Sequence, residues 1–248
     1  MTGVLDGKGA VVTGGSRGIG RAIVERLAAD GAVVAFSYAS RADEAAKAER
    51  AVRDAGGRAV AIRADLRAPD AAEKLMAEAA GHLDGLDILV NNAALEFTAV
   101  PIADTGDDLF DAVMTVNARS AFLTIRHAAR SMRDDGRIIN ISTLNTTRPA
   151  PGIAPYVASK GALEQLTKVA ALELGARGIT VNAVCPGATD TDLLRHANPP
   201  EALARVPELT ALRRLGTPAD IADVVALLAS PGGRWITGEV INATGGLA

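Results

Sequence analysis

The chain has 248 residues, of which 48% are hydrophobic and 22% charged, a balance typical of a folded globular protein. Its 26 basic and 29 acidic residues leave a formal net charge of −3 without any basic run, which argues against a nucleic-acid partner. The first residues lack the apolar core of a signal peptide, and no stretch approaches the ~18 apolar residues of a membrane span, so we expect a cytoplasmic protein with no membrane partner.

Short apolar runs alternate with longer helical patterns along the chain. The predicted strands are Ala10–Val12, Ala32–Tyr38, Ala59–Arg63, Ile88–Val90, Arg137–Ile141, Ile179–Val184 and Val240–Asn242. Several are continuous Val and Ile runs, which are typical of strands buried on both faces. The predicted helices are Gly18–Asp30, Asp43–Ala55, Pro69–Leu83, Asp107–Val116, Ser120–Arg133, Tyr156–Gly175 and Pro218–Ser230. The alternation predicts an α/β fold: a single-domain, Rossmann-type, doubly wound parallel sheet of about seven strands with helices on both faces.

The least regular stretch of the sequence is Thr189–Leu215, which contains three prolines. In a sheet enzyme such a segment is more often a lid over the active site than a domain boundary. We therefore expect one domain over residues 1–248, with a substrate lid around residues 189–215.

A glycine-rich loop directly follows the first predicted strand and opens the first predicted helix. It contains Gly14, Ser16, Arg17, Gly18, Ile19 and Gly20, with the spacing G-x-x-x-G-x-G. Glycines allow a sharp turn and a close approach to phosphate, and the helix N-terminus favours negative charge. A tight glycine turn that binds nothing is the alternative, but the strand before and the helix after it favour a dinucleotide site.

The end of the second predicted strand bears on which dinucleotide is bound. An acid about 20 residues beyond the last glycine would bind the ribose hydroxyl of NAD. Here the strand ends in Tyr38, Ala39, Ser40 and Arg41, with no acid before Asp43. Arg17 and Arg41 could instead meet a 2′-phosphate, with Ser40 donating a hydrogen bond, although Arg41 could also be a solvated loop charge. The pattern favours NADP (NADPH) as the cofactor and leaves NAD possible.

Tyr156 and Lys160 are four residues apart at the start of a predicted helix, so both side chains lie on one helix face. A free tyrosine has a pKa near ~10 and is a weak base at neutral pH. A neighbouring ammonium stabilises the phenolate and brings the group into a useful range. The pair alone is weak evidence for proton-transfer chemistry, because such pairs occur by chance; its position after the glycine loop strengthens it.

Taken together, these residues resemble the classical short-chain dehydrogenase/reductase family, over essentially the whole chain. The motifs that carry the resemblance are Thr13–Gly20, Asp65-Leu66, Asn91-Asn92-Ala93, Asn117, the Tyr156 and Lys160 pair, and Pro186-Gly187 followed by Thr191. Each motif alone could be accidental, but their ordered set is specific. Within the family, the sequence resembles oxoacyl-carrier-protein and polyketide-type ketone reductases.

The resemblance implies roles for the matched positions. It implies a catalytic tetrad of Asn117, a hydroxyl residue, Tyr156 and Lys160, in which Asn117 anchors a water and Lys160 holds the nicotinamide ribose and lowers the tyrosine pKa. The remaining implied cofactor contacts are Asp65 and Leu66 on the adenine side, Asn91 and Ala93 along the cofactor, and Pro186, Gly187, Thr189 and Thr191 on the nicotinamide side. It also implies a homo-oligomer, usually a homotetramer and sometimes a dimer.

The sequence departs from the family pattern at three places. Ala94 stands where the family usually has glycine, and Thr244 stands where an aspartate usually precedes two glycines. The catalytic serine position, 13 residues before Tyr156, falls on Thr143, with Ser142 beside it. A one-residue shift of the intervening loop would put Ser142 in the catalytic role, so Thr143 is the hypothesis and Ser142 the alternative.

The histidines, the cysteine and several polar loop residues carry no specific signal of chemistry. The three histidines lack metal-ligand spacing, so we expect no metal site. Cys185, the single cysteine, cannot form an internal disulfide and is interpreted as a core residue. The resemblance puts Glu96, Asn145, Arg148 and His196 in loops around the pocket, where each could contact substrate or simply be solvated.

We therefore predict an NADP(H)-dependent oxidoreductase that interconverts a carbonyl and a secondary alcohol. The resemblance points to a β-ketoacyl or polyketide-type ketone as the small-molecule substrate, free or carrier-bound. A sugar or secondary-alcohol dehydrogenase is the enzymatic alternative. A nonenzymatic dinucleotide-sensing protein is the alternative of another class, and the intact Tyr156 and Lys160 pair argues against it.

Overall fold

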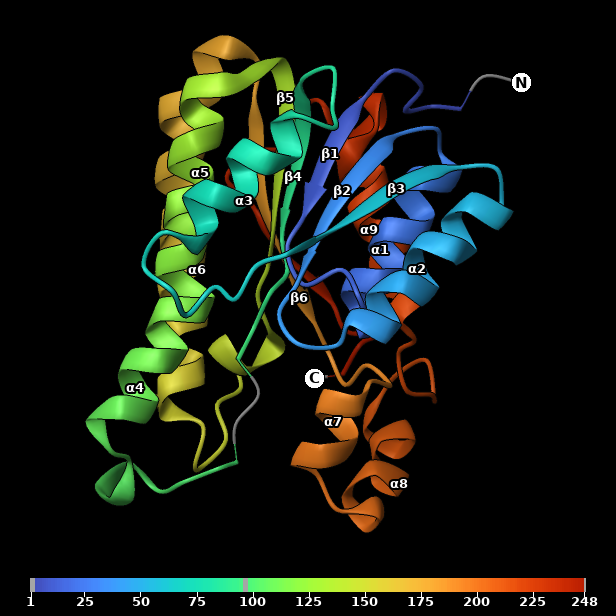
Figure 1. The fold of residues 1–248 in the computed structure, drawn as a ribbon. Coiled ribbons are helices and arrows are strands. Elements are labelled where there is room, and N and C mark those ends of the chain that lie inside the picture. Colours follow the sequence, from blue (N-terminus) through green and yellow to red (C-terminus); the bar gives the residue numbers. More distant parts are fainter. Residues whose placement is uncertain (1–2, 96–97, 248) are drawn as a thin grey trace.

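The computed structural model describes residues 3–95 and 98–247, which form a twisted sheet with helices on both faces (Figure 1). Its seven strands are all parallel and follow the order β3-β2-β1-β4-β5-β6-β7. Their bounds are β1 (Gly9–Val12), β2 (Val33–Tyr38), β3 (Arg58–Arg63), β4 (Leu86–Asn91), β5 (Met132–Ile141), β6 (Thr180–Pro186) and β7 (Val240–Ala243). This arrangement confirms the predicted Rossmann-type, doubly wound parallel sheet.

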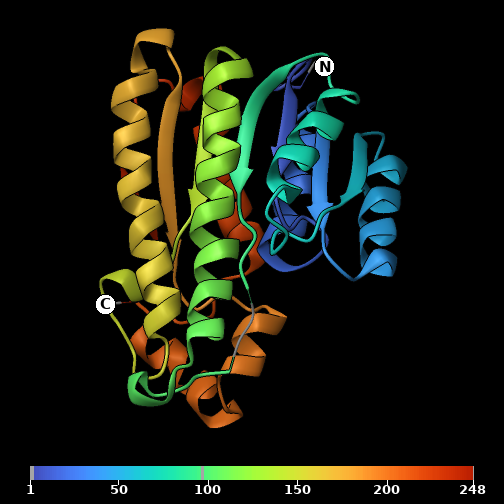
Figure 2. The ribbon, with the colours of Figure 1, turned by 60° about the vertical axis from the view of Figure 1, so that its left-hand side comes forward.

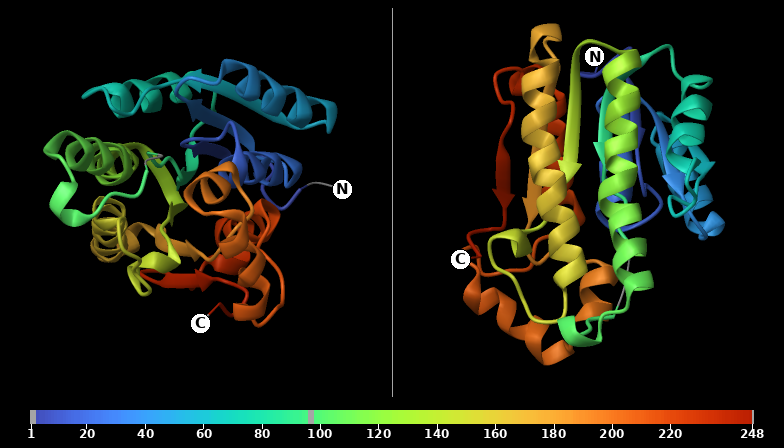
Figure 3. Two further views of the ribbon diagram at one scale, coloured as in Figure 1. Left: turned by 90° about the horizontal axis from the view of Figure 1, so that it is seen from below. Right: turned by 90° about the vertical axis from the view of Figure 1, so that its left-hand side faces the viewer.

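Two helical layers cover the sheet (Figures 1 and 3). One layer contains α1 (Gly18–Ala29), α2 (Ala42–Asp54) and α9 (Pro218–Ala229), and the other contains α3 (Ala71–Ala80), α5 (Ser120–Ser131) and α6 (Ala154–Leu174). The central strands are buried on both faces, as their Val and Ile runs predict: Val12 packs in the α1 core and Val11 in the α3 core. None of the helices in the described ranges combines the length and apolar composition needed to cross a bilayer.

Helix α9 begins with a capping box. The Thr217 hydroxyl accepts from the Asp220 backbone, and the Asp220 carboxylate accepts from the Thr217 backbone at 2.7 Å, which completes a capping box. Pro218 occupies the first turn, where a missing N–H costs nothing.

The chain near the substrate side is more helical than its sequence indicates. Helices α7 (Asp192–Ala197) and α8 (Pro200–Leu209) lie within the stretch predicted to be irregular, below the carboxyl ends of the strands (Figure 1). Pro199 and Pro200 do not break these helices, because they lie at the start of α8, where proline is tolerated.

Backbone hydrogen bonds tie this helical segment down at both ends. At its start, the Asp190 N–H donates to Gly216 O at 2.8 Å, and the Gly216 N–H donates to Ala188 O at 2.9 Å. At its end, Thr210 forms an antiparallel bridge with Leu247, near the chain terminus. These bonds therefore join the two ends of the segment to each other and tie its last helix to the C-terminal tail.

Element bounds differ from the sequence prediction at several places. β5 begins at Met132, five residues before the predicted Arg137, because Met132 pairs with Leu86 across an irregular stretch of β4. α6 begins at Ala154 and not at Tyr156, with Pro155 in its first turn. α4 (Asp107–Met114) and α5 are not separate helices, since a π-helical segment, Thr115–Arg119, joins them into one rod (Figure 2).

Candidate active site

The predicted site residues come together at one edge of the sheet because parallel strands end on the same side. The strand order reverses between β1 and β4, so the chain leaves β1 and β4 in opposite directions and opens a crevice there. The glycine loop follows β1, and Tyr156 and Lys160 begin α6 beyond β5. The adenine-side and nicotinamide-side residues thus fall on opposite sides of this reversal.

The glycine loop has the geometry of an anion cradle. Gly14 and Gly18 have φ values of +69° and +54°, in the left-handed region that side chains disfavour. A Cβ on Gly20 would lie 2.1 Å from Gly14 O, so the turn depends on close backbone approach. The first turn of α1 has neither a side-chain cap nor an acidic residue, which leaves its amides available to a pyrophosphate. These residues fit a dinucleotide.

Asn92 holds this loop in place, a role that the sequence did not reveal. Its Nδ2 donates to Thr13 O and Gly14 O at 3.0 Å each. The Thr13 hydroxyl in turn accepts from the backbone N–H groups of Asn92 and Ala93, also at 3.0 Å. Ala93, a predicted cofactor contact, is thus fixed beside the loop across the β1–β4 crevice.

The side chain of Asn91 does not share this environment. It is 4% exposed, and its Nδ2 donates to Asn140 Oδ1 at 2.9 Å while its Oδ1 accepts from the Thr124 hydroxyl at 2.6 Å. Asn140 then donates to Thr167 Oγ1 at 2.8 Å. This buried polar chain links α5, β4, β5 and α6, so the Asn91 side chain serves the core beneath the site.

The residues predicted for the adenine side lie at the ends of β2 and β3. Tyr38 is half-buried, whereas Ser40 and Arg41 are exposed, and no carboxylate ends β2. Arg17 is partly exposed and lies 3.9 Å from the Asp192 carboxylate at the start of α7. Arg17 in the glycine loop and Arg41 after β2 are therefore both accessible basic side chains.

Asp65 and Leu66 follow β3 and have different environments. The Arg67 guanidinium donates to both carboxylate oxygens of Asp65, with Nε distances of 2.9 and 3.1 Å. This pairing holds the pKa of Asp65 below its ordinary value. Leu66 is 6% exposed and packs in the α3 core, so its side chain mainly supports the turn.

Helix α6 presents Tyr156 and Lys160 to the site. Lys160 is only 2% exposed; its Nζ donates to Ile141 O at 2.7 Å and lies 5.8 Å from the centre of the Tyr156 ring. Burial lowers the pKa of Lys160 from 10.5 to about 8, while Cys185 and Glu164 act in the opposite direction. The ammonium is therefore close enough to act on the tyrosine.

Thr143 and Ser142 point to different partners. The Thr143 side chain forms a hydrogen bond with Tyr156 that favours the phenolate, whereas burial, the larger effect, raises the pKa of Tyr156. The Ser142 hydroxyl donates to Glu164 Oε1 at 2.6 Å. Successive side chains of an extended strand face opposite sides, and of the two hydroxyls it is Thr143 that meets Tyr156.

Asn117 lies in the π-helical segment between α4 and α5 and is 1% exposed. Its Oδ1 accepts from the Leu95 N–H at 2.8 Å, and its Nδ2 donates to Ser159 Oγ at 3.0 Å. Ser159 in turn donates to Tyr156 O at 2.7 Å. π-Helical turns are rare and often occur at functional sites. Asn117 is thus joined to the first turn of α6 through Ser159, which the sequence analysis did not single out.

The predicted nicotinamide-side residues follow β6. Pro186 ends the strand, and Gly187 is required because a Cβ there would lie 2.9 Å from Thr244 Cα. Thr191 caps α7 by accepting from the Leu194 N–H at 3.2 Å, and its hydroxyl donates to Thr189 O at 3.3 Å. A Cβ on Gly18 would lie 3.4 Å from Thr191 Cγ2, so the start of α7 lies against the glycine loop.

The remaining loop residues are less tied to this centre. Asn145 donates through its backbone N–H to Thr143 Oγ1 at 3.3 Å, whereas Arg148 and His196 are exposed. Glu96 lies outside the described residues. Within residues 3–95 and 98–247 no group of three or more His, Cys, Asp or Glu side chains is placed to hold a metal ion.

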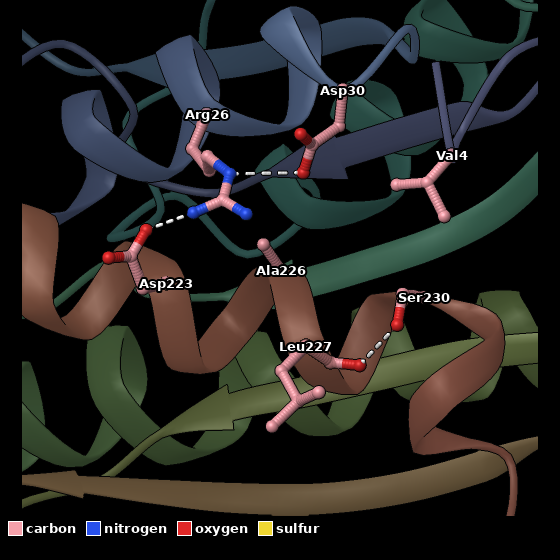
Figure 4. Close-up of a pocket in the computed structure, with 7 residues that line it drawn as sticks. All are labelled: Val4, Arg26, Asp30, Asp223, Ala226, Leu227 and Ser230. Carbon is pink, nitrogen blue, oxygen red and sulfur yellow. Dashed lines mark hydrogen bonds and ion pairs between the residues drawn. The ribbon is translucent and has the colours of Figure 1, made fainter. Parts of the chain in front are cut away.

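Two pockets lie at opposite ends of the sheet, one beside the start of α6 and one between α1 and α9. A pocket of about 400 Å³ adjoins the start of α6 and has apolar walls, lined by Pro101, Ile102, Pro149, Ala150, Pro151, Gly152, Ile153, Ala154 and Val157. A second pocket, of about 430 Å³, lies between the C-terminal ends of α1 and α9, where Arg26 bridges Asp30 and Asp223 (Figure 4). Those helix ends are at the opposite edge of the sheet, so this second pocket is separate from the site.

Comparison with known proteins adds to this geometry. Residues 14–248 match a family model described as enoyl-(acyl carrier protein) reductase. The versicolorin reductase of Emericella nidulans is 39% identical, with 98% of this chain and 96% of that protein covered. A short-chain dehydrogenase/reductase from Serratia marcescens is 45% identical with a TM-score of 0.92, with 98% of each chain covered. The angucycline C-6 ketoreductase LanV, solved with bound NADP, is 42% identical with a TM-score of 0.92, covering 100% of this chain and 98% of its own.

Proposed function

Because the chain belongs to the short-chain dehydrogenase/reductase family of oxidoreductases, we propose that it is an NADPH-dependent reductase of a β-ketoacyl or polyketide-type ketone. The observation that carries the proposal is the array of Thr143, Tyr156 and Lys160 at the edge of the β1–β4 crevice, beside a cradle that fits a dinucleotide. A protein that only senses a dinucleotide needs the cradle but not this array.

The array supplies proton transfer and polarisation of the carbonyl. NADPH, when bound, supplies the hydride for the carbonyl carbon. Tyr156 donates its proton to the carbonyl oxygen, and the Thr143 hydroxyl, already bonded to Tyr156, orients that oxygen. The Lys160 ammonium stabilises the phenolate that Tyr156 leaves behind. Asn117, linked to α6 through Ser159, belongs to the relay that restores the proton.

The cofactor preference rests on charge at the adenine side. Arg17 and Arg41 are accessible basic side chains that would meet a 2′-phosphate, and no acid directly follows β2 to accept from the ribose hydroxyl of NAD. The NADP complex of the similar LanV protein supports the same preference. Gly14, Ser16, Gly18, Ile19 and Gly20 would hold the pyrophosphate, and Thr189 and Thr191 would lie on the nicotinamide side.

The substrate class rests on the apolar surroundings and on the relatives. The pocket beside the start of α6 is walled by proline, alanine, isoleucine and valine, which suits an apolar or aromatic carbon skeleton. The names of the similar versicolorin reductase and angucycline ketoreductase point the same way. We propose that α7 and α8 form the substrate lid, since the start of α7 contacts the glycine loop. The enzymatic alternative is a sugar or secondary-alcohol dehydrogenase.

We further propose that the protein is a cytoplasmic homotetramer. Phe122 on α5 and Leu172 on α6 are 45% and 86% exposed, and Trp235 after α9 is 95% exposed. Phe122 and Leu172 lie on neighbouring helices of one layer, and exposed large apolar side chains that gather in this way are typical of association surfaces. Light scattering of the purified protein measures the assembly directly.

The test of the function is NADPH oxidation with a panel of aromatic, β-ketoacyl and sugar ketones, for wild type and Tyr156→Phe. We expect turnover with the first two classes and a loss of at least about 10²-fold in the variant, at unchanged NADPH affinity. The Phe ring keeps the packing and removes only the hydroxyl. Turnover of sugars alone would favour the alternative dehydrogenase, and a Tyr156→Phe variant as active as wild type would refute the assigned acid.

A further inference from the structure

Glu164 is a carboxylate that the proposed reaction does not use. It lies on α6, four residues after Lys160 and eight after Tyr156, on the same helix face. Its Oε1 accepts from Ser142 Oγ at 2.6 Å and lies 3.4 Å from Cys185 Sγ. Ser142 is 3% exposed and Cys185 1%. Placing a charged carboxylate against buried residues costs free energy unless its hydrogen bonds and its charge are satisfied. The partners of Glu164 are therefore the evidence for its role.

The first consequence concerns the register of β5. The Ser142 N–H donates to Val184 O at 2.7 Å, which keeps this residue in the sheet, and its hydroxyl is drawn to Glu164. The Ser142 side chain is thus fixed toward Glu164. Because consecutive side chains of an extended backbone point in opposite directions, the Thr143 side chain points away from Glu164 and meets Tyr156. Tyr156 and Glu164 are eight residues, or about 12 Å, apart along the helix. Helix α6 therefore holds Ser142 and Thr143, the two residues that directly follow β5, at two separate points.

The second consequence concerns charge. The titratable groups that face Lys160 are Tyr156 and Glu164 on its own helix and Cys185 on β6. Burial raises the pKa of Tyr156, and burial followed by Glu164 raises the pKa of the Cys185 thiol to about 11. Neither group is therefore negative at neutral pH, and Glu164 is the negative neighbour of the buried ammonium.

We propose that Glu164 is a positioning residue of the active site: its carboxylate orients Thr143 through Ser142 and keeps Lys160 protonated. The proposal rests on the proposed function, because it assigns Glu164 a part in the same proton transfer. Glu164 bonds to Ser142 and Cys185, so it acts on Thr143 through Ser142 and on Lys160 through its charge.

The experiment is the pH profile of kcat/KM for ketone reduction in three variants. Glu164→Gln keeps an oxygen for Ser142 and removes the charge, Ser142→Ala removes the hydrogen bond and keeps the charge, and Glu173→Gln neutralises an exposed carboxylate of α6 as the matched control. Thermal unfolding and NADPH binding, measured in parallel, separate misfolding from loss of positioning.

We expect the basic limb of Glu164→Gln to move to lower pH by about half a unit or more, because Lys160 loses its negative neighbour. Ser142→Ala should keep the wild-type limb and lose about three- to tenfold in kcat at unchanged NADPH affinity. Glu173→Gln should match wild type. A purely structural role for Glu164 would lower the unfolding temperature and leave the limb in place, and that result would overturn the proposal.

Two further outcomes have defined meanings. If Glu164→Gln does not fold, Glu164→Asp replaces it, because the shorter side chain keeps the charge but withdraws from Ser142. We then expect kcat to fall while the basic limb of the pH profile stays at the wild-type position. A wild-type kcat in Glu164→Asp would overturn the orienting role. If Tyr156→Phe is fully active, the proposed function fails first. If Tyr156→Phe is inactive and Glu164→Gln has the wild-type limb, only the role of Glu164 is refuted.

Discussion

Replacing Lys160 with methionine is expected to stabilise the cofactor-free protein at neutral pH while abolishing its activity. The pKa of this buried ammonium falls from 10.5 to about 8, chiefly because of burial. Each pKa unit corresponds to about 1.4 kcal/mol, so keeping the side chain charged at pH 7 costs the folded protein about 3 kcal/mol. Methionine removes that cost but also the hydrogen bond from Lys160 Nζ to Ile141 O, which contributes about 1 kcal/mol. The net gain is about 2 kcal/mol.

The sign of the pH dependence distinguishes this reasoning from a packing effect. Between pH 8 and 10.5 the unfolded chain binds more protons at Lys160 than the folded protein does, so wild-type stability rises with pH in this window. The advantage of Lys160→Met should shrink by about 2 to 3 kcal/mol between pH 7 and pH 10, where the two proteins become nearly equal in stability.

Urea unfolding at fixed protein concentration, at pH 7 and pH 10, measures both quantities. Lys168→Met, which removes an exposed lysine from the same helix, is the matched control. A Lys160→Met protein that is less stable than wild type by the same amount at both pH values would refute the reasoning, because the ammonium would then contribute packing alone.

The other predictions concern the hydroxyl and the cofactor. Thr143→Ser should keep most of the turnover and Thr143→Val should lose about 10²-fold or more, measured as kcat, because only serine retains the donor. Ser142→Ala should be less damaging than Thr143→Val, and the reverse order would assign the chemistry to Ser142. Arg41→Asp should shift the ratio of NADPH to NADH dissociation constants toward NADH, because the new carboxylate repels the 2′-phosphate and accepts from the ribose. Equal dissociation constants for the two cofactors in wild type would contradict the assigned role of Arg41.

The fold class and the general position of the site follow from local patterns in the sequence. Apolar runs such as Ala32–Tyr38 predict buried parallel strands, and a glycine loop between a strand and a helix locates the crevice. The family resemblance adds the order of the motifs. These features depend on residues that are close together in the sequence, so they can be predicted without knowledge of tertiary contacts.

What the sequence did not reveal depends on contacts between distant residues. Asn91 and Asn92 are adjacent, yet Asn91 bonds to Asn140 in the core and Asn92 to the glycine loop. The alternation of side chains along a strand predicts that Asn91 and Asn92 point in opposite directions, but it does not predict which of the two faces the glycine loop. Ser142 and Glu164 are 22 residues apart, and only the packing of α6 on β5 brings them together. The irregular start of β5 at Met132 likewise arises from pairing with Leu86 and not from β propensity.

The bridge between Thr210 and Leu247 gives a way to observe the proposed lid in solution. The Leu212 N–H also donates to Gly245 O at 3.0 Å, so the end of the lid segment and the C-terminal tail must move together or separate. The sequence contains one cysteine, Cys185, and its thiol is buried. A fluorophore attached to a Leu247→Cys side chain would therefore label the tail selectively, and its emission or mobility would follow the lid during turnover without any label in the crevice itself.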